Sequence, residues 1–286
     1  MPLLIDAPTL AARLHDPALR IFDTTVFLDR PPAGGPYTAV SRRDRYEEAH
    51  IPGAAFADVP GDLSDPDSPF PFTVPSAERF AAAAGQLGIG PGTSVVVYTQ
   101  DAPGWATRLW WLLRFFGFDD VSVLDGGLTA WRAAGGAIAS GPETYAPGTF
   151  TAVPRRELLA PRADVEQIAA GQADACLVNA LAPRVFRGEG VTNYSRPGRI
   201  PRSVSAPWME LVDPDTQRFL EPDALRERFA GAGALGERPV VAYCGGGISA
   251  TVDLFALALL GRTDARLYDG SLTEWTADPA LPVETG

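Results

Sequence analysis

The chain of 286 residues alternates short apolar runs with longer segments whose apolar positions recur at helical spacing. Four short runs, rich in β-branched or aromatic residues, predict buried strands at residues 95–98, 121–124, 240–243 and 265–268. Two longer segments, at 106–116 and 249–260, predict helices. Strands that alternate with helices are typical of βαβ units. We therefore expect an α/β protein whose mainly parallel sheets carry helices on both faces.

An internal repeat predicts two copies of one domain. Residues 125–131, Asp-Gly-Gly-Leu-Thr-Ala-Trp, return as residues 269–275, Asp-Gly-Ser-Leu-Thr-Glu-Trp. In each half a predicted strand precedes this motif, and the number of residues between the strand and the motif differs by only one. The stretch between the copies is rich in Gly, Pro and Thr and lacks sustained periodicity. We therefore predict domains at 1–139 and 162–286, joined by a linker at 140–161.

The charged residues exclude several classes of protein. The formal net charge is -11 and the pI is near 4.7, which argues against binding to nucleic acids or to anionic membranes. All 24 cationic residues are arginines, so the chain contains no lysine. This absence excludes pyridoxal-phosphate enzymes, Schiff-base aldolases, protein kinases and P-loop NTPases that carry the usual lysine.

The chain contains two histidines, His15 and His50, and two cysteines, Cys176 and Cys244. These are too few and too scattered for a structural zinc site, so we expect no bound metal. Cys176 lies inside an apolar strand, where a thiol is inert. His50 lies in the first half, where we expect a structural hydrogen bond. Two cysteines without an apolar signal segment favour the cytoplasm, and no apolar run is long enough to span a membrane.

Cys244 stands where a nucleophile is expected. It follows the strand at 240–243, opens the loop Cys-Gly-Gly-Gly-Ile-Ser and precedes a helix. Free backbone N–H groups and the positive end of the helix dipole favour a thiolate there, and glycines allow the backbone to approach the sulfur closely. A persulfide anion fits the same loop. Ser249 either caps the helix or offers the nearest hydroxyl group.

Two other interpretations of this loop are weaker. Gly245, Gly247 and Ala250 match a GxGxxA dinucleotide-binding pattern, and Asp269 stands at a suitable distance for a ribose contact. That pattern normally opens a larger nucleotide-binding fold, whereas here it lies in a short repeated unit near the C-terminus. A cysteine phosphatase requires an arginine six residues after its nucleophile, and that position is Ala250.

The motifs together resemble those of the tandem-domain rhodanese sulfurtransferases, over nearly the whole chain. The motifs are Cys-Gly-Gly-Gly-Ile-Ser-Ala at 244–250, Tyr-Asp-Gly-Ser with Glu-Trp within 268–275, His-Ile-Pro-Gly-Ala at 50–54 and Leu-Asp-Gly-Gly-Leu at 124–128. The resemblance implies two rhodanese-like domains, a persulfide-forming Cys244 and no metal or organic cofactor. It also implies a catalytically silent first copy, in which Thr99 aligns with Cys244.

The resemblance further implies the sulfur donor. Family loops with two cationic residues belong to thiosulfate users, and neutral glycine-rich loops belong to 3-mercaptopyruvate users, so residues 245–247 favour 3-mercaptopyruvate over thiosulfate. Gly246 stands where the 3-mercaptopyruvate enzymes usually offer a serine hydroxyl. The implied acceptors are cyanide, a small thiol or thioredoxin. The alternative function is that of a non-catalytic sulfur carrier or binding module on the same scaffold.

The family holds the donor anion with an arginine just before a phenylalanine, and that position is Val185 here. Arg184 and Arg187 flank it, Arg196 fits a second family arginine, and Arg199 replaces a family histidine. A small anion in a protein of negative charge needs local cations. We therefore expect Cys244 as the catalytic residue and the following as substrate-binding residues: Gly245, Gly246, Gly247, Ile248, Ser249, Arg184, Arg187 and Arg196.

Overall fold

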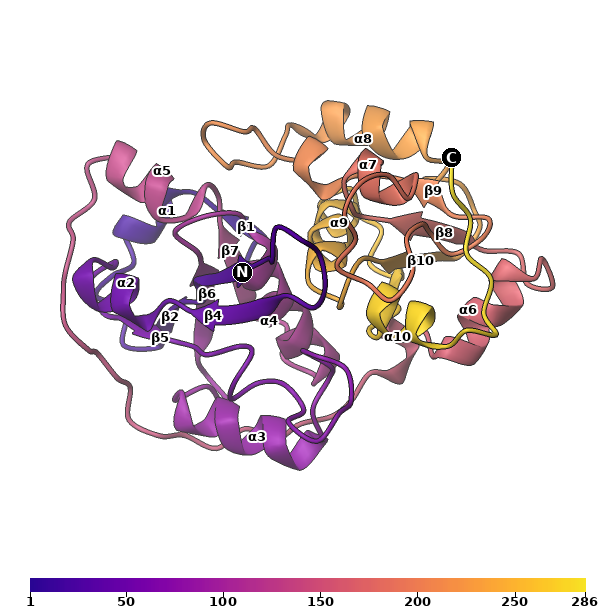
Figure 1. Ribbon diagram of the computed structural model, residues 1–286. Helices are drawn as coiled ribbons and strands as arrows, with labels where there is room; N and C mark the ends of the chain where they lie inside the picture. The colour runs from indigo at the N-terminus through magenta and orange to yellow at the C-terminus, as the bar shows by residue number, and fades with distance from the viewer.

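A computed structural model describes all residues, 1–286, and confirms two α/β units with parallel sheets (Figure 1). The N-terminal sheet has five parallel strands in the order β1-β7-β6-β2-β5. Its strands are β1 (Leu4–Ile5), β2 (Leu19–Asp23), β5 (Ala54–Phe56), β6 (Ser94–Tyr98) and β7 (Val121–Leu124). The predicted strands at 95–98 and 121–124 therefore lie side by side at its centre.

The C-terminal sheet repeats the β7-β6-β2-β5 part of this arrangement with four parallel strands in the order β11-β10-β8-β9. Its strands are β8 (Cys176–Asn179), β9 (Val204–Ser205), β10 (Val240–Tyr243) and β11 (Arg266–Leu267). The predicted strand at 265–268 is thus shortened to two residues. Cys176 lies at the start of β8, buried, as expected for a structural cysteine.

Helices surround both sheets. They are α1 (Ala7–Ala11), α2 (Arg43–Glu48), α3 (Ala77–Gln86), α4 (Gly104–Phe115), α5 (Gly127–Ala133), α6 (Arg162–Ala169), α7 (Pro183–Phe186), α8 (Pro222–Gly231), α9 (Ser249–Leu259) and α10 (Ser271–Ala277), with short 3₁₀ turns η1 (Arg156–Leu158) and η2 (Trp208–Glu210). No helix combines the length and the apolar character that a membrane span requires.

The central strand β6 shows why both faces of the N-terminal sheet are covered. All five of its residues are buried, and successive side chains of a strand point to opposite faces. Val95 and Val97 belong to the large core shared with the C-terminal half, whereas Val96 and Tyr98 belong to a separate cluster on the other face. A strand buried on both sides needs the continuous apolar run that the sequence shows.

The two halves meet through the equivalent helices α4 and α9, which lie between the sheets (Figure 1). The hydroxyls of Thr107 and Thr251 hydrogen bond across the interface at 2.9 Å. The ring of Trp110 packs edge-on against Phe255, with centroids 4.8 Å apart. These residues occupy equivalent or nearly equivalent places in the two copies. The repeat in the sequence therefore becomes a pseudo-symmetric interface, and α9 is held firmly where it follows the Cys244 loop.

The segment predicted as a linker follows the outside of the N-terminal half as extended chain (Figure 1). The Tyr145 hydroxyl donates to the Gly53 carbonyl at 2.5 Å and accepts from the Ile21 N–H at 2.8 Å. The Gly148 N–H donates to the Gly85 carbonyl at 2.8 Å. These bonds tie the segment to the N-terminal half along its length.

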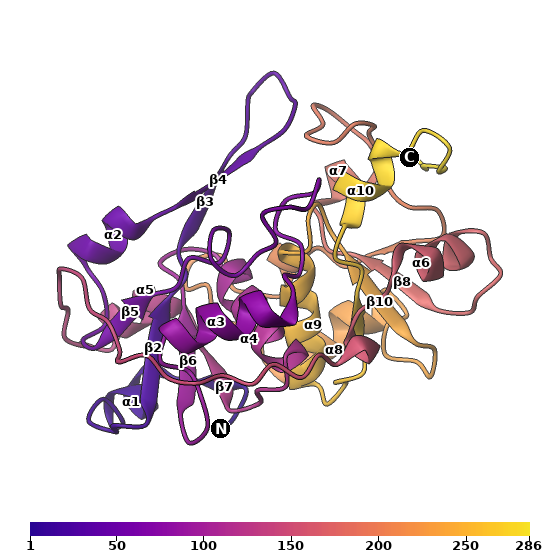
Figure 2. The ribbon, with the colours of Figure 1, turned by 90° about the horizontal axis from the view of Figure 1, so that it is seen from below.

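One element of the N-terminal half has no counterpart in the C-terminal half and was not anticipated from the sequence. It is the antiparallel hairpin of β3 (Val26–Asp29) and β4 (Thr38–Ser41), which projects away from the sheet (Figure 2). The tip between the strands reaches the C-terminal half, where the Gly35 N–H donates to the Thr192 carbonyl at 3.2 Å. The hairpin thereby brings N-terminal residues to the neighbourhood of Cys244.

Candidate active site

Cys244 directly follows β10 and precedes α9, and 2% of its surface is exposed. Its own N–H donates to the Ser271 hydroxyl at 3.0 Å. The N–H groups of residues 245–249 donate to no group of the protein. Unpaired N–H groups in one loop before a helix form an anion-binding concavity. The loop is therefore built to hold a thiolate or a persulfide anion.

Each of the three glycines has a close neighbour where a side chain would begin. A Cβ atom at Gly245 would collide with the Tyr194 hydroxyl, and one at Gly246 would lie 3.1 Å from the Tyr37 hydroxyl. Gly247 has a φ of +76°, and a Cβ there would lie 2.8 Å from the Asp269 carboxylate. Only glycine adopts such a φ at no steric cost. The loop is thus neutral and closely covered by side chains from other segments.

Ser271 occupies an unusual conformation that positions Cys244. Its φ is +50°, in the left-handed region, and its equivalent in the first copy is Gly127, with a φ of +54°. The Ser271 hydroxyl donates to the Tyr268 carbonyl at 2.9 Å and accepts from the Cys244 N–H. Strained non-glycine residues of this kind concentrate at functional sites. Ser271 adopts a strained backbone conformation, and in this conformation its hydroxyl forms the hydrogen bond that orients the start of the loop.

A buried ion pair supports the loop from the domain interface. Arg108 of α4 is fully buried, and its guanidinium lies 2.7 Å from the carboxylate of Asp269. Arg108 also donates to the carbonyls of Phe72 and Gly247, at 2.5 and 3.3 Å. Asp269 accepts from the Val74 N–H at 2.7 Å. The pair links both domains to the third glycine of the loop.

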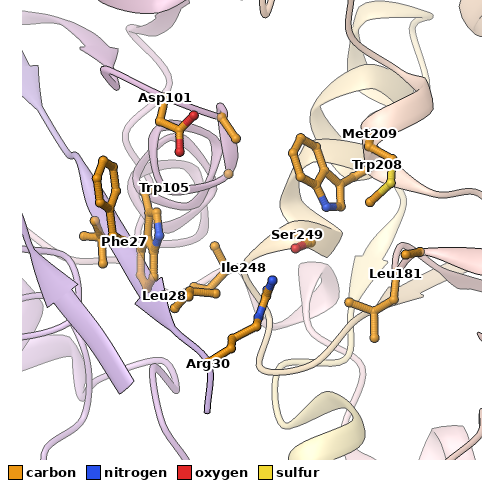
Figure 3. A pocket seen from close by; sticks show the side chains of 14 residues that line it. Phe27, Leu28, Arg30, Asp101, Trp105, Leu181, Trp208, Met209, Ile248 and Ser249 are labelled. Atoms are coloured by element: carbon orange, nitrogen blue, oxygen red, sulfur yellow. The ribbon is translucent and has the colours of Figure 1, made fainter. Parts of the chain in front are cut away.

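A cavity of about 420 Å³ lies between the domains beside this loop. Ile248 and Ser249 line one part of it, and Trp105 and Trp208 line opposite sides (Figure 3). Arg30, at the end of β3, extends into the cavity toward Ser249 (Figure 3). Its guanidinium forms no ion pair, although Asp101 lines the same cavity. The cavity therefore offers a small anion one free cation next to the start of α9.

The sequence pattern of the rhodanese-like domain matches residues 6–134 and 186–278. The chain belongs to the rhodanese family. It is 40% identical over 291 residues to a Pseudomonas aeruginosa protein named "Probable 3-mercaptopyruvate sulfurtransferase", covering 99% of this chain and 98% of that one. It is 33% identical over 290 residues to the 3-mercaptopyruvate sulfurtransferase of Escherichia coli K12, covering 98% and 97%.

A solved structure leads to the same family. The crystal structure of SseA from Escherichia coli, a "Rhodanese" fold of the 3-mercaptopyruvate sulfotransferases, superposes with a TM-score of 0.79. The two chains are 32% identical, and the match covers 95% of this chain and 99% of SseA. The protein is therefore a rhodanese-type sulfurtransferase with two domains, as its motifs predicted.

The equivalent loop of the N-terminal copy begins with a hydroxyl instead of a thiol and forms hydrogen bonds within its own segment and to Thr25. The Thr99 hydroxyl donates to the carbonyls of Asp101 and Ala102, at 2.9 and 3.1 Å. The Gln100 N–H donates to the Thr25 hydroxyl at 2.9 Å. The first copy has Thr99 in place of Cys244 and therefore lacks a thiol at this position.

The three arginines predicted to bind the donor lie outside the cavity that Arg30 lines. Arg187 is half-exposed and forms a bidentate pair with Glu189, at 2.7 and 2.8 Å. Arg196 donates to the carbonyls of residues 275, 276 and 278 at the end of α10. Arg184 is exposed on α7 and forms no ion pair. None of the three arginines lines the interdomain cavity.

Two further residues named from the rhodanese motifs are structural here. Arg199 lies over the ring of Phe186, 4.4 Å from its centroid, and pairs with Glu284 at 3.5 Å. His50 is fully buried within the N-terminal half, stacked on Tyr46 with centroids 4.4 Å apart. Its Nδ1 lies 2.8 Å from the Tyr46 carbonyl. This agrees with the structural hydrogen bond expected for His50.

Ser249 lies where the sequence motifs place it, whereas the hairpin adds two residues that the motifs do not indicate. Ser249 is the first residue of α9 rather than its N-cap, and it lines the cavity. Arg30 and Tyr37 were not named from the sequence, because the hairpin that carries them is absent from the second copy. In the sequence, Arg30 directly follows the mostly apolar run Val26–Asp29. A charged residue at the end of such a run predicts exposure to solvent and not a place in a site.

Proposed function

We propose that this sulfurtransferase takes sulfur from 3-mercaptopyruvate and passes it to a thiophilic acceptor through a persulfide on Cys244. The observation that carries the proposal is the set of unpaired N–H groups at 245–249. Such groups stabilise negative charge on sulfur, in a thiolate and in a persulfide alike. The names of the two bacterial relatives support the choice of donor.

Two steps complete the proposed cycle. The Cys244 thiolate attacks the donor sulfur, the carbon–sulfur bond breaks, and its electron pair leaves on the enolate of pyruvate. The proton of the transferred S–H group moves to the enolate carbon, so pyruvate departs and Cys244 holds a persulfide anion. A thiolate or cyanide then attacks the outer sulfur, and cleavage of the sulfur–sulfur bond regenerates the Cys244 thiolate.

We assign the donor carboxylate to Arg30. An α-keto acid carries a single negative charge, which matches the one free guanidinium in the cavity, whereas thiosulfate is a dianion that gains more from several cations. Ser249 and Ile248 line the cavity together with Arg30, and we propose that they contact the donor. We propose that the backbone of Gly245, Gly246 and Gly247, deeper in the loop, surrounds the transferred sulfur. Arg184 is the second candidate, because it too is unpaired.

We further propose a small acceptor and a cytoplasmic location. The cavity beside the Cys244 loop is large enough for cyanide or a small thiol. Thioredoxin, as a folded protein, would reach Cys244 only after displacement of the side chains that cover it, since 2% of Cys244 is exposed. The two unpaired cysteines support a reducing compartment such as the cytoplasm.

The donor is tested by incubating the protein with 3-mercaptopyruvate or thiosulfate and measuring its mass and its turnover with cyanide. We expect 3-mercaptopyruvate to give a kcat/KM at least about tenfold higher. A peptide containing Cys244 should gain about 32 Da, one sulfur atom. The Cys244→Ser variant should lose turnover, whereas Cys176→Ser should retain it. A tenfold preference for thiosulfate contradicts the proposed donor, and loading without turnover favours a sulfur carrier.

The anchor is tested with Arg30→Gln, using Arg184→Gln as the matched control. Loss of a charge-assisted contact costs about 1.5 to 3 kcal/mol, so Arg30→Gln should lower kcat/KM by roughly 10- to 150-fold, chiefly through KM. Arg184→Gln should remain close to the wild type. If the loss appears in Arg184→Gln instead, the carboxylate is held by the residue predicted from the motif.

A further inference from the structure

The catalytic loop of this protein lacks a hydroxyl group between Cys244 and Ser249. At Gly246 the space beside the backbone is nevertheless polar, because it is filled by the hydroxyl of Tyr37. A Cβ atom at Gly246 would lie 3.1 Å from this oxygen and 3.5 Å from the ring of Phe72. A hydroxyl from another part of the chain thus stands where a loop side chain would otherwise be.

Tyr37 reaches this place because the hairpin tip is docked on the C-terminal half. The Gly35 N–H donates to the Thr192 carbonyl, and the Asn193 side chain donates to the Gly35 carbonyl at 3.0 Å. The Tyr37 ring stacks on Phe72 with centroids 6.3 Å apart and an interplanar angle of 25°. It also meets Tyr194 edge-on, with centroids 6.5 Å apart. Two docking bonds and two ring contacts fix the direction of its hydroxyl.

The protonation of Tyr37 suits a hydrogen-bond donor. Burial, together with the neighbouring Cys244, raises its pKa to about 12 against the opposing effects of Thr273 and Arg30. The phenol therefore keeps its proton at neutral pH. Its hydroxyl lies beside Gly246, two residues after Cys244. A neutral hydroxyl in this loop can donate to negative charge that develops during sulfur transfer and can exchange a proton with the reacting groups.

We propose that Tyr37, from the catalytically silent domain, supplies the hydroxyl that handles the proton of sulfur transfer in place of a loop side chain. This inference rests on the proposed function. As the carbon–sulfur bond breaks, the Tyr37 hydroxyl gives its proton to the enolate of pyruvate. The S–H proton of the new Cys244 persulfide then passes to the Tyr37 oxygen, which restores the phenol. The donor contributes three hydrogens and pyruvate leaves with three, so atoms and charge balance.

The test is Tyr37→Phe, which keeps the ring contacts and removes only the oxygen. With 3-mercaptopyruvate as donor and cyanide as acceptor, we expect kcat to fall about 100-fold, within the usual contribution of general acid catalysis. KM should change by less than about threefold, because Arg30 still holds the carboxylate. The loss should exceed that of the matched variant Tyr194→Phe, whose hydroxyl faces Gly245 instead.

A second variant separates chemistry from packing. In Tyr37→Phe the oxygen no longer crowds position 246, so the double variant Tyr37→Phe with Gly246→Ser can place a hydroxyl there. We expect this double variant to recover at least about tenfold in kcat over Tyr37→Phe alone. A packing defect would not be repaired by an added hydroxyl.

Three results would overturn the role of Tyr37 while leaving the proposed function intact. The first is a Tyr37→Phe variant whose kcat stays within about threefold of the wild type. The second is a larger loss in Tyr194→Phe than in Tyr37→Phe, and the third is the absence of any recovery with Gly246→Ser. A wild-type protein whose Cys244 is loaded by no donor overturns the proposed function, and this inference falls with it.

Discussion

Ser271 has a strained backbone conformation and also forms a hydrogen bond that positions Cys244. The first copy of the repeat places glycine in the same left-handed conformation, so the fold requires a positive φ there in both domains. The C-terminal copy has a serine side chain at this φ, and its hydroxyl accepts a hydrogen bond from the N–H of Cys244. A left-handed non-glycine residue costs about 1 to 3 kcal/mol, so the hydroxyl must stabilise the site in return.

We predict that Ser271→Ala is less stable than Ser271→Gly. Alanine keeps the strain and leaves the buried Cys244 N–H without its acceptor, which together cost about 1 to 3 kcal/mol. Glycine loses the same hydrogen bond but removes the strain. Both variants should lower kcat, since each frees the start of the loop. Urea denaturation and steady-state kinetics measure the two effects, and equal stability of the two variants would contradict the role of strain.

At the scale of a single element, α9 contains a carboxyl group that its surroundings do not satisfy. Asp253 is fully buried on this otherwise apolar helix, and neither of its oxygens has a hydrogen-bond partner. Burial raises its pKa well above the usual value. Between that usual value and the raised one, the native state holds a proton that the unfolded chain has lost. The contribution of Asp253 to stability therefore falls as pH rises.

We predict that Asp253→Asn removes this pH dependence. The free energy of unfolding should exceed that of the wild type at pH 8, by about 1 to 3 kcal/mol, and the difference should shrink toward pH 5. Asp67→Asn, at an exposed position, serves as the control and should leave the pH profile unchanged. Urea titrations at several pH values provide the measurement. A difference that grows toward acid pH would contradict this assignment.

At the scale of the whole molecule, one fully buried arginine joins the two domains beneath the catalytic loop. Arg108 pairs with Asp269, and its two terminal nitrogens also donate to the carbonyls of Phe72 and Gly247. In the second copy the equivalent residue is Val252, so the pair breaks the pseudo-symmetry of the interface. The unmatched ion pair contacts the Cys244 loop, because Arg108 donates to the carbonyl of Gly247.

We predict that Arg108→Met destabilises the protein strongly. Removing one partner of a buried pair leaves the Asp269 charge uncompensated, at a cost of about 3 to 5 kcal/mol. Adding Asp269→Asn should recover part of this loss, because the amide oxygen still accepts from the Val74 N–H. Arg226→Met, which breaks an exposed pair with Asp223, is the matched control and should scarcely change the Tm. Calorimetry of the four proteins tests the prediction.

The local patterns of the sequence were sufficient to predict the fold, and they make Cys244 the expected nucleophile. Continuous apolar runs are typical of strands in sheets that helices cover on both faces, and the repeated motif indicates two copies of one domain. Equivalent tyrosines even make equivalent bonds, since Tyr98 accepts from the Ile51 N–H at 3.2 Å and Tyr243 from the Ile200 N–H at 3.1 Å. Cys244 was identified because a thiol between a strand and a helix, followed by glycines, has a distinctive local sequence.

What surrounds Cys244 was decided by tertiary structure alone. Arg30 and Tyr37 stand more than 200 positions before it and belong to a hairpin without a counterpart in the second copy. Arg187 and Arg196, which lie closer along the chain, are bound instead to Glu189 and to carbonyls at the end of α10. The local sequence determines where strands, helices and loops form, because these depend on local backbone preferences. The partners of a charge or a hydroxyl depend on docking between distant segments, which only the folded chain specifies.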